Sequence, residues 1–148
     1  MDISHLIQSS LAPVFLLSGV ATTLGVLTNR LARIIDRARR LEEQVQSHPG
    51  RAPQLRGTLA SLERRARYIN VAISLATVAA LMVALVVVAL FANAYLLHSD
   101  LGIGIALLFV GSMSCLSAAF IAFFIEVRIA VKALRIEIPR TPGPAAPP

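Results

Sequence analysis

The chain has 148 residues, a length that suits one domain, but its composition is not that of a soluble one. Hydrophobic residues make up 56% of the sequence, charged residues only 15%, and the mean hydropathy is +0.72. A compact soluble domain needs a polar surface that so few charged residues cannot supply. The composition therefore excludes an ordinary soluble globular protein and favours an integral membrane protein.

Three long runs of the sequence contain no charged residue: 6–28, 69–97 and 101–125. Each run exceeds the roughly 20 residues that a helix needs to cross about 30 Å of hydrocarbon. The first run follows MDISH, which has no Lys or Arg, so we interpret it as a retained span rather than a cleavable signal peptide. The sequence predicts an all-α integral membrane protein with three transmembrane helices.

The net charge of +6 is distributed unevenly along the chain. Ten of the 14 basic residues lie between Arg30 and Arg67, and the other four lie between Arg128 and Arg140. Basic residues beside membrane spans mark the cytoplasmic side. We therefore expect the N-terminus outside and the C-terminus in the cytoplasm, and we expect no nucleic-acid partner.

Between the first two spans and on into the second, apolar residues recur at the alternating spacings of 3 and 4 that are typical of a coiled-coil seam. The first set is Leu31, Ile34, Ala38, Leu41 and Val45, and the second is Leu55, Leu59, Leu62, Ala66, Ile69, Ile73 and Ala76. Helix breakers separate the sets, with Pro49, Gly50 and Pro53 at the expected turn. The pattern predicts a cytoplasmic antiparallel helical hairpin whose two helices continue into the spans.

These observations divide the chain into six segments. They are an outer N-terminus with span one (1–28), the cytoplasmic hairpin (29–68), span two (69–97), an outer loop (98–102), span three with a cytoplasmic helical extension (103–138), and a disordered proline-rich tail (139–148).

The arginines that follow span one form a stripe on one helix face: Arg30, Arg33, Arg37 and Arg40. One interpretation is a solvated face that marks topology. The other is a surface that binds anionic lipid headgroups or surrounds the inner mouth of a pathway, because the planar guanidinium matches phosphate. Among the acidic residues, Asp36 lies within reach of arginines on its own helix. Glu126, at the inner edge of span three, is expected to pair with Arg30 or Arg67.

The segment TNRLARIIDRARRLEE (28–43), with Pro13 in the preceding span and a helical return into span two, resembles the bacterial membrane proteins grouped as the domain of unknown function 2721. The resemblance covers residues 5 to about 135, and Asn29–Arg39 is its most specific part. It implies a three-span protein of the bacterial inner (plasma) membrane. It brings no established activity.

Span one carries a mildly polar face made of Ser18, Thr22, Gly25 and Asn29. Small and hydroxyl residues permit close contact between helices. They also suit the wall of a narrow pore. The sequence leaves both interpretations open.

Chemistry that would support catalysis is missing from the spans, which contain no acidic or basic side chain. No spacing of His, Cys or carboxylate residues resembles a metal site, and there is no phosphate loop or nucleophile motif. The lone Cys115 is interpreted as a packing residue. We therefore expect no enzyme activity, no catalytic residue, no metal and no cofactor.

Two functions from different classes remain. In the first, the chain forms a homo-oligomer whose span-one helices surround a narrow ion pathway. In the second, it is a non-conducting membrane scaffold whose cytoplasmic hairpin docks a soluble protein partner. The polar face of span one favours the first function slightly.

Overall fold

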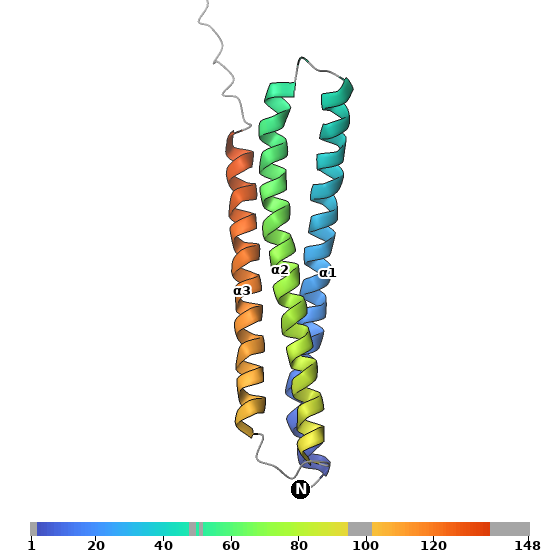
Figure 1. The fold of residues 1–148 in the computed structure, drawn as a ribbon, viewed down its shortest axis with the longest axis vertical. Coiled ribbons are helices and arrows are strands. Elements are labelled where there is room, and N and C mark those ends of the chain that lie inside the picture. The colour runs from blue at the N-terminus through green and yellow to red at the C-terminus, as the bar shows by residue number, and fades with distance from the viewer. Residues whose placement is uncertain (1–2, 48–49, 51, 95–101, 137–148) are drawn as a thin grey trace, which may run out of the picture.

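The computed structural model describes residues 3–47, 50, 52–94 and 102–136, and it is helical almost throughout. Three helices follow in chain order: α1 (Ile3–Ser47), α2 (Ala52–Ala92) and α3 (Gly102–Ile136) (Figure 1). Each contains a stretch long and apolar enough to cross a membrane. The prediction of an all-α fold with three helices capable of spanning a membrane is confirmed.

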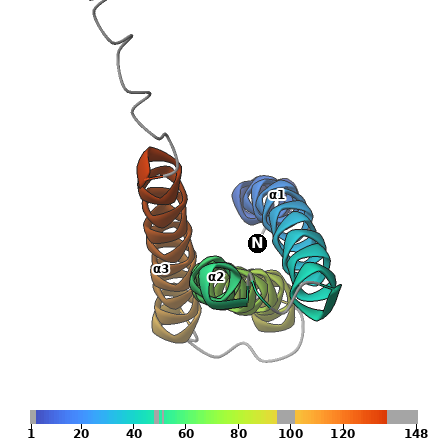
Figure 2. The same ribbon diagram turned by 90° about the horizontal axis from the view of Figure 1, so that it is seen from above.

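The middle helix, α2, holds the fold together. It runs antiparallel to both α1 and α3 and packs extensively against each of them, whereas α1 and α3 contact each other far less. Figure 2, seen along the helices, shows α2 between the other two. The N-terminus lies at the same end of the molecule as the end of α2 and the start of α3.

A heptad pattern organises the packing along the whole length of the bundle. In α1 the buried positions recur every seven residues: Pro13, Val20, Leu27 and Ile34. In α3 they include Ser112, Ala119, Ala122 and Glu126. In α2 they include four alanine and valine positions of the span, Ala76, Ala79, Val83 and Val86. Small residues on facing helices let the backbones approach closely, which supplies packing where no water drives association.

The predicted hairpin seam lies at the contact between α1 and α2. Ile34, Leu62 and Ile69 are buried in one core cluster, and other seam residues pack against it: Leu31, Ala38, Leu41, Ala66 and Ile73. The expected turn differs at one position. Pro53 lies in the first turn of α2 rather than between the helices, because a proline there has no backbone hydrogen bond to lose.

The helices pass through the segment boundaries that the sequence suggested. Helix α1 is continuous across residues 28 and 29, and α2 is continuous across residues 68 and 69. Pro13 also lies inside α1 without ending it, although its ring removes one backbone hydrogen bond. The predicted outer loop, apart from Gly102, and the predicted proline-rich tail lie outside the described residues.

Candidate functional site

One charged residue from each helix, close to the end of its uncharged stretch, lies at a common level of the bundle. Arg30 follows Ile3 by 27 residues, Arg65 precedes Ala92 by 27, and Glu126 follows Gly102 by 24. At 1.5 Å per residue these separations correspond to about 36–40 Å. A bilayer is about 30 Å thick in its hydrocarbon core and about 40–45 Å with its headgroups. Three charged side chains from three helices therefore meet about one bilayer thickness from the opposite end of the bundle.

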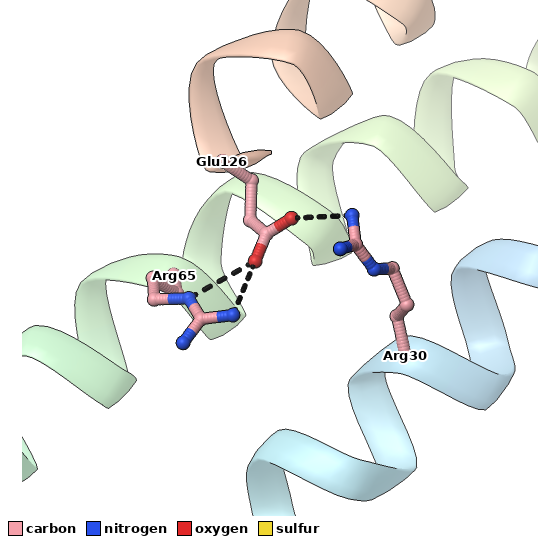
Figure 3. A network of polar contacts seen from close by, with 3 residues as sticks. All are labelled: Arg30, Arg65 and Glu126. Carbon is pink, nitrogen blue, oxygen red and sulfur yellow. Dashed lines mark hydrogen bonds and ion pairs between the residues drawn. The ribbon is translucent and has the colours of Figure 1, made fainter. Parts of the chain in front are cut away.

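Glu126 is the centre of this level (Figure 3). Its side chain is fully buried, and both of its oxygens accept hydrogen bonds from arginines on the other two helices. Arg30 Nη1 donates to Oε2 at 3.1 Å. Arg65 donates to Oε1 through Nε at 3.0 Å and through Nη2 at 2.9 Å. We call these three residues the ion triad.

The ion triad supplies the polar connection between α1 and α3, the two helices that contact each other least. The Arg30 guanidinium also lies over the ring of Phe123, 5.2 Å from its centroid. Phe123 and Glu126 are three residues apart on α3, so both meet the same side chain of α1. The ion pair with Glu126 and the cation–π contact with Phe123 together hold Arg30 against α3.

The second partner of Glu126 differs from the sequence expectation. Arg65, not Arg67, makes the contact, and Arg67 is exposed without an ion pair to any described residue. Two residues along a helix correspond to a rotation of about 200°, so Arg67 faces away when Arg65 faces α3. Asp36 is also exposed and has no ion pair within the described parts of the chain.

The sequence did contain a signal for the two triad arginines. Arg30 lies three residues after buried Leu27 and four before buried Ile34. Arg65 holds the equivalent place in α2, three after Leu62 and four before Ile69. A charged residue at these spacings from two buried residues points into the helix contact, whereas Arg67 does not fit the pattern.

A groove of about 230 Å³ opens beside the ion triad. Four arginines and one glutamate line it together with two apolar residues: Arg30, Arg33, Arg37, Arg65, Glu126, Ile34 and Leu62. Of the predicted arginine stripe, Arg30, Arg33 and Arg37 thus meet at this groove. Arg40 lies further along α1 beside Arg33, Asp36 and Arg37.

The polar face of span one turns away from the bundle. Ser18, Thr22, Gly25 and Asn29 are all exposed. Two of the hydroxyls bond within their own helix: Ser18 Oγ donates to the Val14 carbonyl at 3.3 Å, and Thr22 Oγ1 donates to the Ser18 carbonyl at 3.0 Å. Within a single copy these residues neither pack against α2 nor enter the groove.

Similarity to known proteins places the chain in a family. Residues 10–136 match the family described as protein of unknown function (DUF2721). The chain belongs to this family. The match begins within span one and ends with α3, so it contains the ion triad and the hairpin. Neither the curated proteins nor the solved structures contain a significant match.

Proposed function

We propose that this DUF2721 protein is a scaffold in a bacterial inner membrane, with its N-terminus outside and its C-terminus in the cytoplasm. In this proposal the part of the α1–α2 hairpin beyond the ion triad is a rigid docking platform for an acidic cytoplasmic protein. Beyond the triad, α1 continues for 17 residues and α2 for 13. They would project about 20–26 Å from the headgroup layer.

The observation that carries the proposal is the buried Glu126 with its two arginines. An exposed salt bridge would add little order, but a fully buried carboxylate bonded by two guanidiniums fixes the positions of its partners. The base of the hairpin is thereby held on α3 at the membrane surface. A platform held in this way presents its surface in one orientation, which a docking role requires.

The charge of the platform indicates the class of partner. Residues 31–64, beyond the ion triad, contain seven arginines and four acidic residues, and exposed arginines lie on both helices of the platform, such as Arg39 on α1 and Arg64 on α2. Complementary charge favours an acidic partner surface and speeds its encounter at low salt.

Site-specific photo-crosslinking in living cells tests the platform. A photoreactive residue at Arg39 or Arg64 should give one heterologous adduct of constant mass, and the same residue at Leu107, on the exposed apolar face of span three, should not. Adducts only between copies of this chain would contradict the scaffold. The topology is tested separately in a Cys115→Ser background. A cysteine at Ser99 should react with an impermeant thiol reagent in intact cells, whereas a cysteine at Ser47 should not.

A second candidate function, a homo-oligomeric pore, is favoured by the exposed polar face of α1. If copies met through this face, Ser18, Thr22 and Asn29 would line a common axis. The hydroxyl bonds of Ser18 and Thr22 within their own helix weigh against it, because such side chains are also tolerated in lipid. Liposomes containing the protein distinguish the two functions. The scaffold predicts no ion flux above empty liposomes, and the pore predicts flux that Thr22→Leu abolishes.

A further inference from the structure

The groove beside the ion triad has a strong excess of positive charge. Four guanidiniums and one carboxylate line it, which gives a net charge of +3. A second groove, of about 610 Å³, lies elsewhere on the hairpin, and its charged lining is balanced: Arg39, Arg56, Glu42 and Glu63. The two grooves therefore differ in charge although α1 and α2 line both of them, and Glu126 of α3 lines only the first.

Many donors in the positive groove have no acceptor. Each guanidinium carries five N–H donors. Glu126 accepts one from Arg30 and two from Arg65. Arg33 and Arg37 are exposed and form no hydrogen bond or ion pair with the described residues. Glu126 already accepts three hydrogen bonds and has about four acceptor sites, so most of the remaining donors are available to a ligand.

From this arrangement we infer that the groove binds a terminal phosphate group with more than one negative oxygen, with Arg33 and Arg37 as its principal ligands and the free donors of Arg30 and Arg65 beside them. Planar guanidiniums bind phosphate oxygens in pairs, and several of them together favour a group with more than one negative oxygen. The groove volume of about 230 Å³ equals that of several water molecules at about 30 Å³ each. A phosphate group therefore fits in the groove.

Two sources could supply such a group: the headgroup of an anionic lipid or a free phosphate. The level of the ion triad favours the headgroup, because the uncharged stretches of the three helices end near it and lipid phosphates would lie at that level. Glu126 acts as a positioning residue, since it holds Arg30 and Arg65 at the groove and contacts no ligand oxygen itself. The inference does not depend on the docking platform, because the groove is the same if the protein forms a pore.

Binding can be measured with the full chain in a zwitterionic detergent. Three soluble probes are titrated by calorimetry at about 0.15 M salt: dihexanoyl phosphatidic acid, dihexanoyl phosphatidylcholine and inorganic phosphate. The test variant is Arg33→Gln with Arg37→Gln. The matched control is Arg39→Gln with Arg56→Gln, which removes the same charge from the balanced groove. Circular dichroism checks that both variants keep their helices.

We expect phosphatidic acid to bind and phosphatidylcholine not to bind. The test variant should weaken binding at least about tenfold, since each lost contact is a hydrogen bond to a charged group. The control variant should change the affinity less than about twofold, because salt screens most of the attraction between the ligand and charges outside the groove. Phosphatidic acid binding tighter than inorganic phosphate would assign the site to a headgroup, and equal affinities would assign it to free phosphate.

Three results would overturn the inference. The first is phosphatidylcholine binding as well as phosphatidic acid. The second is an equal loss of affinity in the test and control variants, which would indicate diffuse attraction to the hairpin. The third is no saturation by phosphatidic acid or inorganic phosphate below about 10 mM, an affinity too weak for a built site.

Discussion

The bundle has two halves that meet at the ion triad, and they share one heptad seam but differ in what they expose. In the uncharged half most of the large exposed side chains are apolar, as with Phe15, Ile103 and Leu107, which are 73%, 76% and 66% exposed. In the charged half the exposed side chains are mostly Arg, Glu and Gln. One heptad seam passes through both halves without a break. The same heptad spacing of buried residues therefore occurs in both halves. The exposed side chains differ, because those of one half suit lipid and those of the other half suit water.

The contacts that hold each half together also differ. The charged half buries larger side chains, such as Ile34 and Leu62. The hydrophobic effect drives their burial, because this half would lie in water. The uncharged half relies on alanine, valine and serine, because lipid gives apolar helices no reason to associate except close fit. Substitutions that remove volume should therefore act in the charged half, and substitutions that add volume should act in the spans.

The largest effect is expected at the boundary itself, from Glu126→Ala. The substitution leaves the part-buried Arg30 and Arg65 facing each other without the carboxylate, and breaking a buried pair in this way costs about 3–5 kcal/mol. Thermal unfolding followed by circular dichroism should shift accordingly, and protease should cut the hairpin faster. Glu63→Ala is the control, because Glu63 is exposed and has no ion pair to the described residues.

A third variant separates the charge of the triad from its packing. Replacing Arg30, Arg65 and Glu126 together by Leu removes every charge and keeps the site filled, so stability should return to near that of the wild type. If Glu126→Ala were no more destabilising than Glu63→Ala, the ion triad would not hold the hairpin on α3.

The next effect tests the charged half alone. Leu62 is 3% exposed and lies in the core cluster with Ile34 and Ile69. Leu62→Ala should cost about 3 kcal/mol from lost burial and the cavity that remains. Ile35→Ala removes a similar volume from a side chain that is 44% exposed, and should cost under about 1 kcal/mol. Equal protease sensitivity of the two variants would show that Leu62 is not in the seam.

The fold was predictable from the sequence to the extent that burial and charge determine it. The uncharged runs predicted the three helices. The spacing of Ile34, Leu41 and Leu62 predicted the faces through which α1 and α2 pack against each other. The rotation of α3 about its axis was not predictable, because its sequence is apolar on all sides and gives no preferred face. The direction in which Glu126 points was therefore not predictable. The choice of Arg65 over Arg67 was predictable from the spacing of Arg65 to Leu62 and Ile69, but the sequence expectation did not use that spacing.

The polar face of α1 was a different kind of problem. The pattern of Ser18, Thr22, Gly25 and Asn29 distinguishes one face of the helix from the others, but it does not say what that face meets. The seam around Val20 and Leu27 took the opposite side of α1, because larger aliphatic side chains bury more surface against α2 than small polar ones do. The polar face of α1 is therefore not buried within a single copy of the chain.

The smallest expected effects come from adding volume at two glycines of the spans. A Cβ built on Gly111 would lie 2.7 Å from Met82 Cε, whereas a Cβ on Gly25 would meet nothing within 4 Å. Gly111→Ala should therefore be mild, since the tip of Met82 can move. Gly111→Leu should separate α2 and α3 at that level and cost about 1–3 kcal/mol.

Gly25→Leu is the matched substitution, because both changes replace a glycine inside a helix and share the gain in helix propensity. In a single copy Gly25→Leu should leave thermal stability and oligomer size unchanged, since the new side chain would point into lipid. Size-exclusion chromatography with light scattering measures the second quantity. If Gly25→Leu instead dissociated a wild-type oligomer, the polar face of α1 would be a contact between copies. The comparison of the two halves would then change, because the uncharged half would contain a second packing surface, and the pore would gain the support that one copy of the chain cannot give it.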